Sequence, residues 1–275
     1  MKILFLSSEI DPFANSYDLA TFAKKLTISL HHNKDLDLRL MHPKYGFISD
    51  RKYILREVIR LRDLELDFNG QKISVNLKSG FIPNSRVQVY FVENQEYFKN
   101  ISELIYKSKN GRIYLDNLMR FCLFDLVVLE TMKKLFWAPD VIICNDLQSS
   151  MVPIMLKNKY KTDDFYSNTK IVSIFNSINK DFRYFTDKEY NALSLESAGK
   201  KNDNLVLALE NSDLSILFNY KDQIPNKFFN RNKSVKQVFE KNKGKIINLD
   251  SSISDVEWNS VSEQLLDILK KIVKK

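Results

Sequence analysis

The chain has 275 residues, of which 44% are hydrophobic and 28% charged, so it can bury the core of one large or two small globular domains. Its net charge of +8 comes from lysines spread along the whole sequence, which favours a solvated basic surface and argues against a nucleic-acid site. We expect a cytoplasmic protein without a membrane helix, a metal site or a disulfide, because no apolar run reaches about 20 residues and the two cysteines are isolated.

The amino terminus predicts a strand followed by a helix. Ile3–Leu6 is a continuous apolar run, which is typical of a strand buried on both faces of a parallel sheet. Asp18 is the expected N-cap of a helix that reaches Leu30, because apolar residues recur there at helical spacing. In sheets built from such units, ligands bind at the carboxyl ends of the strands. The polar corner Ser7–Leu19 is therefore expected to form one wall of a ligand site.

Further strands and helices follow in turn. We expect strands at Asp35–Met41, Leu64–Phe68, Ile73–Leu77, Val87–Val92, Val141–Cys144, Ile171–Phe175, Leu214–Phe218 and Lys245–Leu249. We expect helices at Tyr114–Leu135, Ser149–Tyr160, Leu205–Leu209 and Trp258–Val273. Asn69 and Gly70 are a strong hairpin signal between two of the strands. The pattern predicts an α/β fold, with a parallel sheet flanked by helices and a β-hairpin insertion.

The opening sequence carries a family resemblance. MKILFLSSEIDPFANSYDLATFAKKL resembles the start of bacterial glycogen and starch synthases, which reads roughly K-I-L-x-x-x-S-E-x-x-P-F-A-K-T-G-G-L-A-D-V. The matching positions include Glu9, Pro12, Phe13, Ala14, Leu19 and Ala20. Later stretches are also similar to that family: Pro43–Gly46, Glu93–Phe98, Tyr114–Phe124 and Cys144–Gln148. The resemblance covers residues 1–218 and implies a Rossmann-like domain, the amino-terminal half of a GT-B glycosyltransferase.

The resemblance also implies an activity. Members of this family transfer glucose from ADP-glucose to an α-1,4-glucan with retention of configuration, so ADP-glucose is the implied donor, a glycogen-like glucan the implied partner, and no other cofactor is expected. In GT-B enzymes a second domain holds most of the donor, and no later stretch of this chain resembles it. A catalytic role would be performed either by the chain alone or with a partner chain that carries a donor domain. Residues 219–275 lie outside the resemblance, and we expect them to be a divergent tail whose amphipathic helix packs on the same domain.

The loop that meets the donor differs from the family at four positions. Where the family has Lys-Thr-Gly-Gly, the chain has Asn15, Ser16, Tyr17 and Asp18. A diphosphate leaving group requires cations and backbone N–H groups, and glycine lets the backbone approach it closely. The chain has lost the cation and gained a carboxylate. Loss of one charge-assisted contact weakens binding by about tenfold to a hundredfold, so this loop predicts poor binding of a nucleotide sugar.

Five further residues are candidates for substrate binding because of their family positions. They are Tyr97, Asn117, Asp146, Gln148 and Asn176. Each has a structural alternative: a carboxylate at such a corner commonly caps a helix, an Asn after a strand commonly forms a turn, an Asn at a helix start can serve the helix, and an aromatic residue beside a strand is commonly core. No catalytic residue and no metal ligand is identified.

Two interpretations of the function remain open, beside a third that rests on net charge alone, the binding of nucleic acid or another polyanion. The first is a synthase-like glycosyltransferase domain that is incomplete and weakly active or inactive alone. The alternative is a non-catalytic module that binds glucan or regulates another protein. Three strand ends, Ser7–Tyr17, Asn145–Gln148 and Phe175–Asn176, are expected to converge on one crevice in either case.

Overall fold

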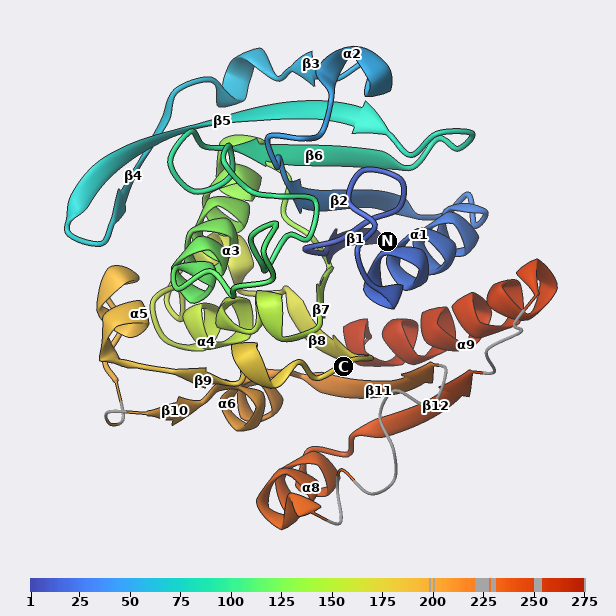
Figure 1. Cartoon of the computed structure of the whole chain (residues 1–275). Helices are drawn as coiled ribbons and strands as arrows, with labels where there is room; N and C mark the ends of the chain where they lie inside the picture. Colours follow the sequence, from blue (N-terminus) through green and yellow to red (C-terminus); the bar gives the residue numbers. More distant parts are fainter. Residues whose placement is uncertain (198, 200, 221–227, 229–230, 250–253, 275) are drawn as a thin grey trace.

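The computed structural model describes residues 1–197, 199, 201–220, 228, 231–249 and 254–274 (Figure 1). The strands are β1 (Lys2–Leu6), β2 (Asp37–Pro43), β3 (Arg56–Glu57), β4 (Leu64–Phe68), β5 (Gln71–Phe81), β6 (Gln88–Glu93), β7 (Val141–Asn145), β8 (Lys170–Phe175), β9 (Tyr184–Phe185), β10 (Asn202–Asp203), β11 (Leu214–Tyr220) and β12 (Lys245–Leu249). The α-helices are α1 (Asp18–His31), α2 (Asp50–Tyr53), α3 (Asn117–Lys134), α4 (Met151–Lys157), α5 (Asp187–Ala192), α6 (Asn204–Asn211), α8 (Lys233–Lys241) and α9 (Asp255–Val273).

A ten-stranded sheet organises the molecule. Its strand order is β12-β11-β8-β7-β1-β2-β6-β5-β3, and β4 pairs with β5 beside this path. Every neighbouring pair from β12 to β6 is parallel, whereas β5 runs antiparallel to β6, β3 and β4. This arrangement confirms the α/β fold with a mostly parallel sheet and a β-hairpin insertion. At the hairpin turn, Asn69 and Gly70 both have positive φ, of 52° and 74°, as a type I′ turn requires.

The side of the sheet on which successive strands are added changes at β1, in the middle of the sheet. From β1 the chain first adds β2 and then β6 on one side, and it later adds β7, β8, β11 and β12 on the other. Helices that follow strands on either side of such a switch point leave a crevice between them at the carboxyl ends of the strands. The fold therefore places its ligand crevice after β1 and β7.

Helices cover both faces of the sheet. Figure 1 shows α1 and α9 together on one face and α3 and α4 on the other, and α6 packs against α4. Phe22 of α1 contacts Phe218 of β11 and Trp258 of α9, with ring centroids 5.1 and 5.7 Å apart. The tail helix thus joins the core of the sheet. None of the helices in the described ranges is long and apolar enough to cross a membrane.

The start of α1 differs from the sequence prediction. Asp18 is not the N-cap but the first helical residue, and the extended N-cap is Tyr17, whose side chain makes no capping hydrogen bond. The backbone N–H of Tyr17 instead donates to the Glu9 carboxylate. The chain therefore turns into the helix at Tyr17, one residue before the predicted N-cap. Asp18 consequently places its carboxylate in the first turn, where the positive end of the helix dipole favours an anion.

Candidate functional site

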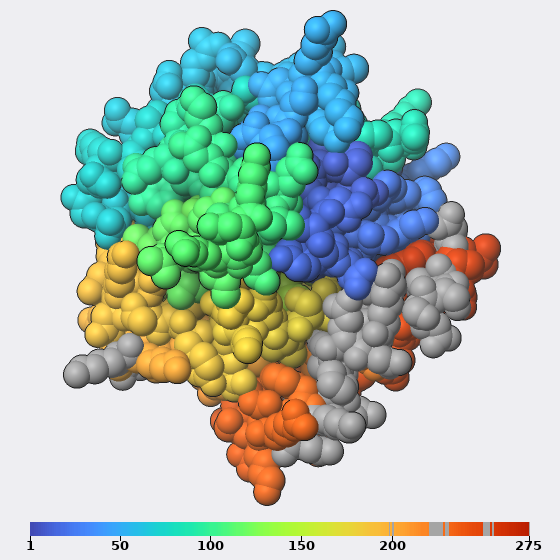
Figure 2. Space-filling model, in the orientation of Figure 1, coloured from blue at the N-terminus to red at the C-terminus, as the bar shows by residue number. Residues whose placement is uncertain are grey.

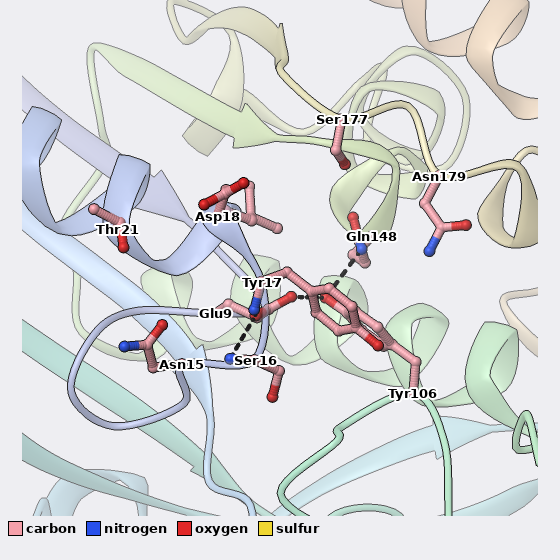
Figure 3. Close-up of a pocket in the computed structure, with 11 residues that line it drawn as sticks. Glu9, Asn15, Ser16, Tyr17, Asp18, Thr21, Tyr106, Gln148, Ser177 and Asn179 are labelled. Atoms are coloured by element: carbon pink, nitrogen blue, oxygen red, sulfur yellow. Dashed lines mark hydrogen bonds between the residues drawn. The ribbon is translucent and has the colours of Figure 1, made fainter. Parts of the chain in front are cut away.

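The principal pocket lies in the crevice at the carboxyl ends of β1, β7 and β8 (Figure 3). Its volume is about 590 Å³, and its walls come from Glu9 after β1, Gln148 after β7, Ser177 after β8, the first turn of α1, and Tyr106. Tyr106 belongs to the segment 99–116, which follows β6 and meets the amino-terminal loop and the segment after β8 on one face of the molecule (Figure 2). Four segments distant in sequence therefore build one site.

Tyr106 is the centre of a buried hydrogen-bond network. Its hydroxyl donates to the Glu9 Oε1 at 2.7 Å and accepts from the Gln148 Nε2 at 3.0 Å. The Ser8 Oγ lies 2.9 Å from the same hydroxyl. The acceptor of the Gln148 amide, its Oε1, is buried and has no hydrogen-bond partner within the described residues. A buried acceptor without a partner is costly, and the Gln148 side chain lines the pocket, so a ligand hydroxyl that reaches this oxygen would stabilise it.

The Glu9 carboxylate holds the loop that follows β1. Its Oε2 accepts the backbone N–H groups of Ser16 and Tyr17 at 3.3 and 3.0 Å. Burial raises the pKa of Glu9 to about 7, against the lowering effect of the hydrogen bonds from Tyr106 and the two backbone N–H groups. Both N–H groups are consequently occupied by a carboxylate of the protein itself.

Two tyrosine rings lie on one side of the pocket. Tyr17 stacks on Tyr106 with ring centroids 5.5 Å apart and planes 20° from parallel (Figure 3). Tyr106 is buried, whereas 41% of Tyr17 is exposed. Segment 99–116 is anchored for this contact by Gly46, because the Gly46 N–H donates to the Phe98 carbonyl and a Cβ at Gly46 would lie 1.8 Å from the Lys99 carbonyl oxygen.

Polar residues at the strand ends join β1, β7 and β8. The Asn145 Nδ2 donates to the Ser7 Oγ at 3.2 Å, and the Asn176 Nδ2 donates to the Asn145 Oδ1 at 3.1 Å. Asp146 has a φ of 66° and accepts hydrogen bonds from the Leu147 N–H, the Ser177 N–H and the Ser177 hydroxyl. Burial raises the pKa of Asp146. The structure therefore brings the three expected strand ends together, with Asp146 and Asn176 buried behind the pocket wall.

The other candidates lie farther from the cavity. Asn117 donates from Nδ2 to the Tyr106 carbonyl at 2.8 Å and accepts from Arg120 at 2.7 Å, so it positions the backbone beside Tyr106. Tyr97 is 7% exposed and packs edge-on against Phe68. Of the five candidates, Gln148 lines the pocket directly. The four residues of the donor loop, Asn15 to Asp18, all line it as well.

The pocket lining combines two carboxyl groups with polar, aromatic and aliphatic side chains. In the described part of the chain its lining contains the carboxylates of Glu9 and Asp18 but no lysine or arginine. Asn15 donates to Asp11, whose carboxylate also pairs with Lys24. The remaining lining groups are amides, hydroxyls, the two aromatic rings and the aliphatic side chain of Leu19, an arrangement suited to a neutral polyol rather than to an anion.

Sequence reasoning did not identify Tyr106, Ser177 or Asn179 as pocket residues, and it matched Glu9 to the family without giving it a role. Tyr106 lies in an irregular segment without periodicity, and its place depends on distant contacts at Gly46 and Asn117. Asn176 was predicted at the end of a strand, and Ser177 is the next residue, so this strand end was the available signal for Ser177.

Comparison with known families identifies the chain. Residues 2–225 match the model of the starch synthase catalytic domain. The chain belongs to this family. It is 28% identical over 274 residues to the glycogen synthase of Pelodictyon phaeoclathratiforme, a match that covers 96% of the chain and 55% of that relative. It is 35% identical over 171 residues to the glycogen synthase of Chlorobium luteolum, over 62% of the chain and 35% of the relative.

Among solved structures, the fold resembles the catalytic domain of starch synthase IV from Arabidopsis thaliana, bound to ADP and acarbose. The TM-score is 0.71 at 17% identity, and the match covers 90% of this chain and 50% of the other. The chain therefore has the fold of one half of a two-domain glycosyltransferase. It spans about half the length of the first synthases that it matches.

Proposed function

We propose that this starch-synthase-family domain binds a neutral α-1,4-glucan in the principal pocket, called the sugar pocket below. We also propose that the domain by itself transfers little or no glucose from ADP-glucose. The observation that carries the proposal is the lining of the pocket, where two carboxylates and the unpartnered Gln148 oxygen occur without any lysine or arginine among the described residues. A diphosphate would find no lysine or arginine to neutralise it among the described lining residues, whereas a sugar hydroxyl could donate to Gln148.

The aromatic pair supports the same ligand class. The exposed part of the Tyr17 ring offers an apolar face with a negative quadrupole, on which the C–H face of a sugar ring can pack. The ADP and acarbose in the plant starch synthase structure are both ligands of that protein. Only the saccharide has chemistry that fits the lining of this pocket.

Loss of the pocket's aromatic platform tests the proposal. Affinity electrophoresis in a glycogen gel should retard the wild-type chain without any nucleotide, and Tyr17→Ala should weaken that retardation by about tenfold. Tyr184→Ala is the matched control, because Tyr184 is 40% exposed and lies outside the pocket. Free migration of the wild type, or equal retardation of Tyr17→Ala and wild type, would contradict glucan binding at this site.

The unpartnered amide provides a second test. Gln148→Met keeps the length of the side chain but removes both its acceptor and its donor to Tyr106. We expect retention on the glycogen gel to fall by about tenfold. Far-UV circular dichroism and the unfolding midpoint report whether the fold is preserved, and unchanged retention by a folded variant would exclude Gln148 from the contact.

A second candidate function is catalysis with a partner chain. The likeness of the fold to one half of a synthase domain that binds ADP favours it, because the other half could be supplied separately. This candidate requires ADP-glucose-dependent incorporation of labelled glucose into glycogen when the chain is mixed with a carboxyl-terminal synthase domain. Absence of incorporation above that of the added domain alone would exclude it.

A further inference from the structure

A second cavity lies at the amino-terminal ends of β8, β11 and β12, opposite to the strand ends that form the first pocket. Its volume is about 420 Å³, and its rim carries four lysines, Lys170, Lys243, Lys245 and Lys271. Lys170 begins β8, whereas Ser177 of the first pocket follows the end of the same strand. At about 3.3 Å per residue, the two cavities are separated by roughly the length of the strand, about 20 Å.

The lysines of this cavity are not neutralised by its single carboxylate. Asp213 accepts the backbone N–H of Ile171 at 2.8 Å, and its other oxygen lies 3.4 Å from the Lys157 Nζ, outside the group of four. Within the described residues none of the four cavity lysines forms an ion pair. The cavity therefore has an excess of positive charge available to an anion.

One wall of the cavity is apolar. Ile268 and Ile272 are one helical turn apart on α9, and both are only half buried although they face the cavity. Leu214 at the start of β11 continues this wall. A ligand that fills the cavity must therefore present both negative charge and an apolar surface.

The turn between α8 and β12 holds two of the lysines in place. Lys243 has a φ of 55°, an uncommon conformation for lysine, and the next residue is Gly244, where a Cβ would lie 2.4 Å from the Phe239 ring. This close packing fixes the backbone that carries Lys243 and Lys245. The helix dipole accounts for a lysine in the last turn of α9, such as Lys271, but not for the other three, which come from the start of β8 and from the α8–β12 turn.

The cavity is built mainly from residues beyond the family match. That match ends at residue 225, and the lysine turn and α9 both lie after it. Lys170, Asp213 and Leu214 are the only cavity residues named above that fall inside the match. The site is separate from the sugar pocket and is formed mainly by residues that follow the stretch matched by the family model.

We propose that this cavity binds a small phosphate monoester that carries an apolar ring, with the phosphate held by Lys243 and Lys245 and the ring against Ile272. Lysine ammonium groups bind phosphate as point charges, and the isoleucine wall removes the ring from water. Phenyl phosphate, inorganic phosphate and pyrophosphate are suitable probes, because they separate the contribution of the ring from that of the charge.

Calorimetric titration of the whole chain tests this site. Phenyl phosphate should bind saturably and more tightly than inorganic phosphate, and Lys243→Gln with Lys245→Gln should weaken both by about tenfold or more. Lys72→Gln with Lys188→Gln is the matched control, because it removes the same charge from exposed positions elsewhere. Maltoheptaose binding should remain unchanged in both double variants, so that a failure here is distinct from a failure at the sugar pocket.

The apolar wall has its own variant. Ile272→Gln should abolish the preference for phenyl phosphate over inorganic phosphate and leave pyrophosphate binding within about twofold. The proposal is overturned by absence of saturable binding, by equal losses in the two lysine double variants, or by equal wild-type affinities for phenyl and inorganic phosphate. Binding of an oligothymidylate in place of all three probes would instead assign the lysines to a nucleic acid and would also overturn it.

Discussion

Strand β8 connects two cavities that differ in charge. At its carboxyl end it leads to a pocket lined by Glu9 and Asp18, with no lysine or arginine among the described residues, whereas at its amino end it begins a cavity with four lysines. The net charge of +8 therefore does not describe the sugar pocket at all. The comparison shows that charge identifies a ligand only after its position in the fold is known, and that each end can be altered separately.

The largest expected effect comes from Gly46→Ala, which acts on the sugar-pocket end. The new Cβ would meet the Lys99 carbonyl at 1.8 Å, so segment 99–116 must shift and Tyr106 must leave its network. We expect a loss of about 3 kcal/mol in the free energy of unfolding and no detectable glucan binding. Urea denaturation measures the first. Gly199→Ala, where a Cβ meets nothing within 4 Å, should be nearly neutral, and an equally small effect at Gly46 would contradict the anchoring role.

Glu9→Gln should change how stability depends on pH. The folded pKa of Glu9 is raised from 4.5 to about 7, so the folded state binds a proton more tightly and wild-type stability falls as pH rises from about 4.5 through about 7. This loss is on the order of 3 kcal/mol. Glu9→Gln cannot titrate at this position and lacks this loss. Its free energy of unfolding relative to wild type should therefore rise between about pH 4.5 and pH 7.

Glu65→Gln provides the control for the pH experiment because Glu65 is exposed on β4. Denaturant titrations at pH 4.5, 6 and 8 measure all three proteins. A parallel pH dependence for Glu9→Gln and wild type would show that Glu9 does not carry the raised pKa.

Restoring the family's donor loop should alter the ligand preference of the same pocket. A variant with Asn15→Lys, Tyr17→Gly and Asp18→Gly regains a cation and loses the carboxylate and the ring. We expect ADP-glucose affinity to rise by about tenfold to a hundredfold and glucan retention to fall. Asp18→Asn alone should give a smaller gain. Calorimetry measures both ligands, and unchanged ADP-glucose affinity in the triple variant would mean that the loop does not exclude the donor.

The smallest effect concerns the helix that supports the lysine cavity. Ser29 of α1 donates to the Asn259 Oδ1 of α9 at 2.8 Å. Asn259→Ala should cost about 1 kcal/mol in the free energy of unfolding and leave maltoheptaose binding unchanged. Thermal and urea denaturation measure the loss, and altered sugar binding would show that the two ends of the sheet are coupled.

The sequence predicted the parallel sheet, the hairpin and the convergence of three strand ends because apolar runs, Asn69-Gly70 and polar strand exits are local signals. It did not predict the network around Tyr106, since that residue reaches Glu9 through contacts 97 residues apart in the chain. The amphipathic tail helix was expected to pack on the domain, and Ile268 and Ile272 do pack against the core, but they are only half buried and also line the lysine cavity. Local pattern locates an apolar face, but tertiary packing decides how much of it is covered.

The most direct test of the central claim is a pair of calorimetric titrations of the unaltered chain with maltoheptaose and with ADP-glucose. A pocket with two carboxylates and an unpartnered amide oxygen should release heat with the oligosaccharide and give no saturable signal with the nucleotide sugar. Micromolar binding of ADP-glucose that disappears in Gln148→Met would contradict the account, because it would place the diphosphate sugar in a pocket that we describe as fit only for a neutral ligand.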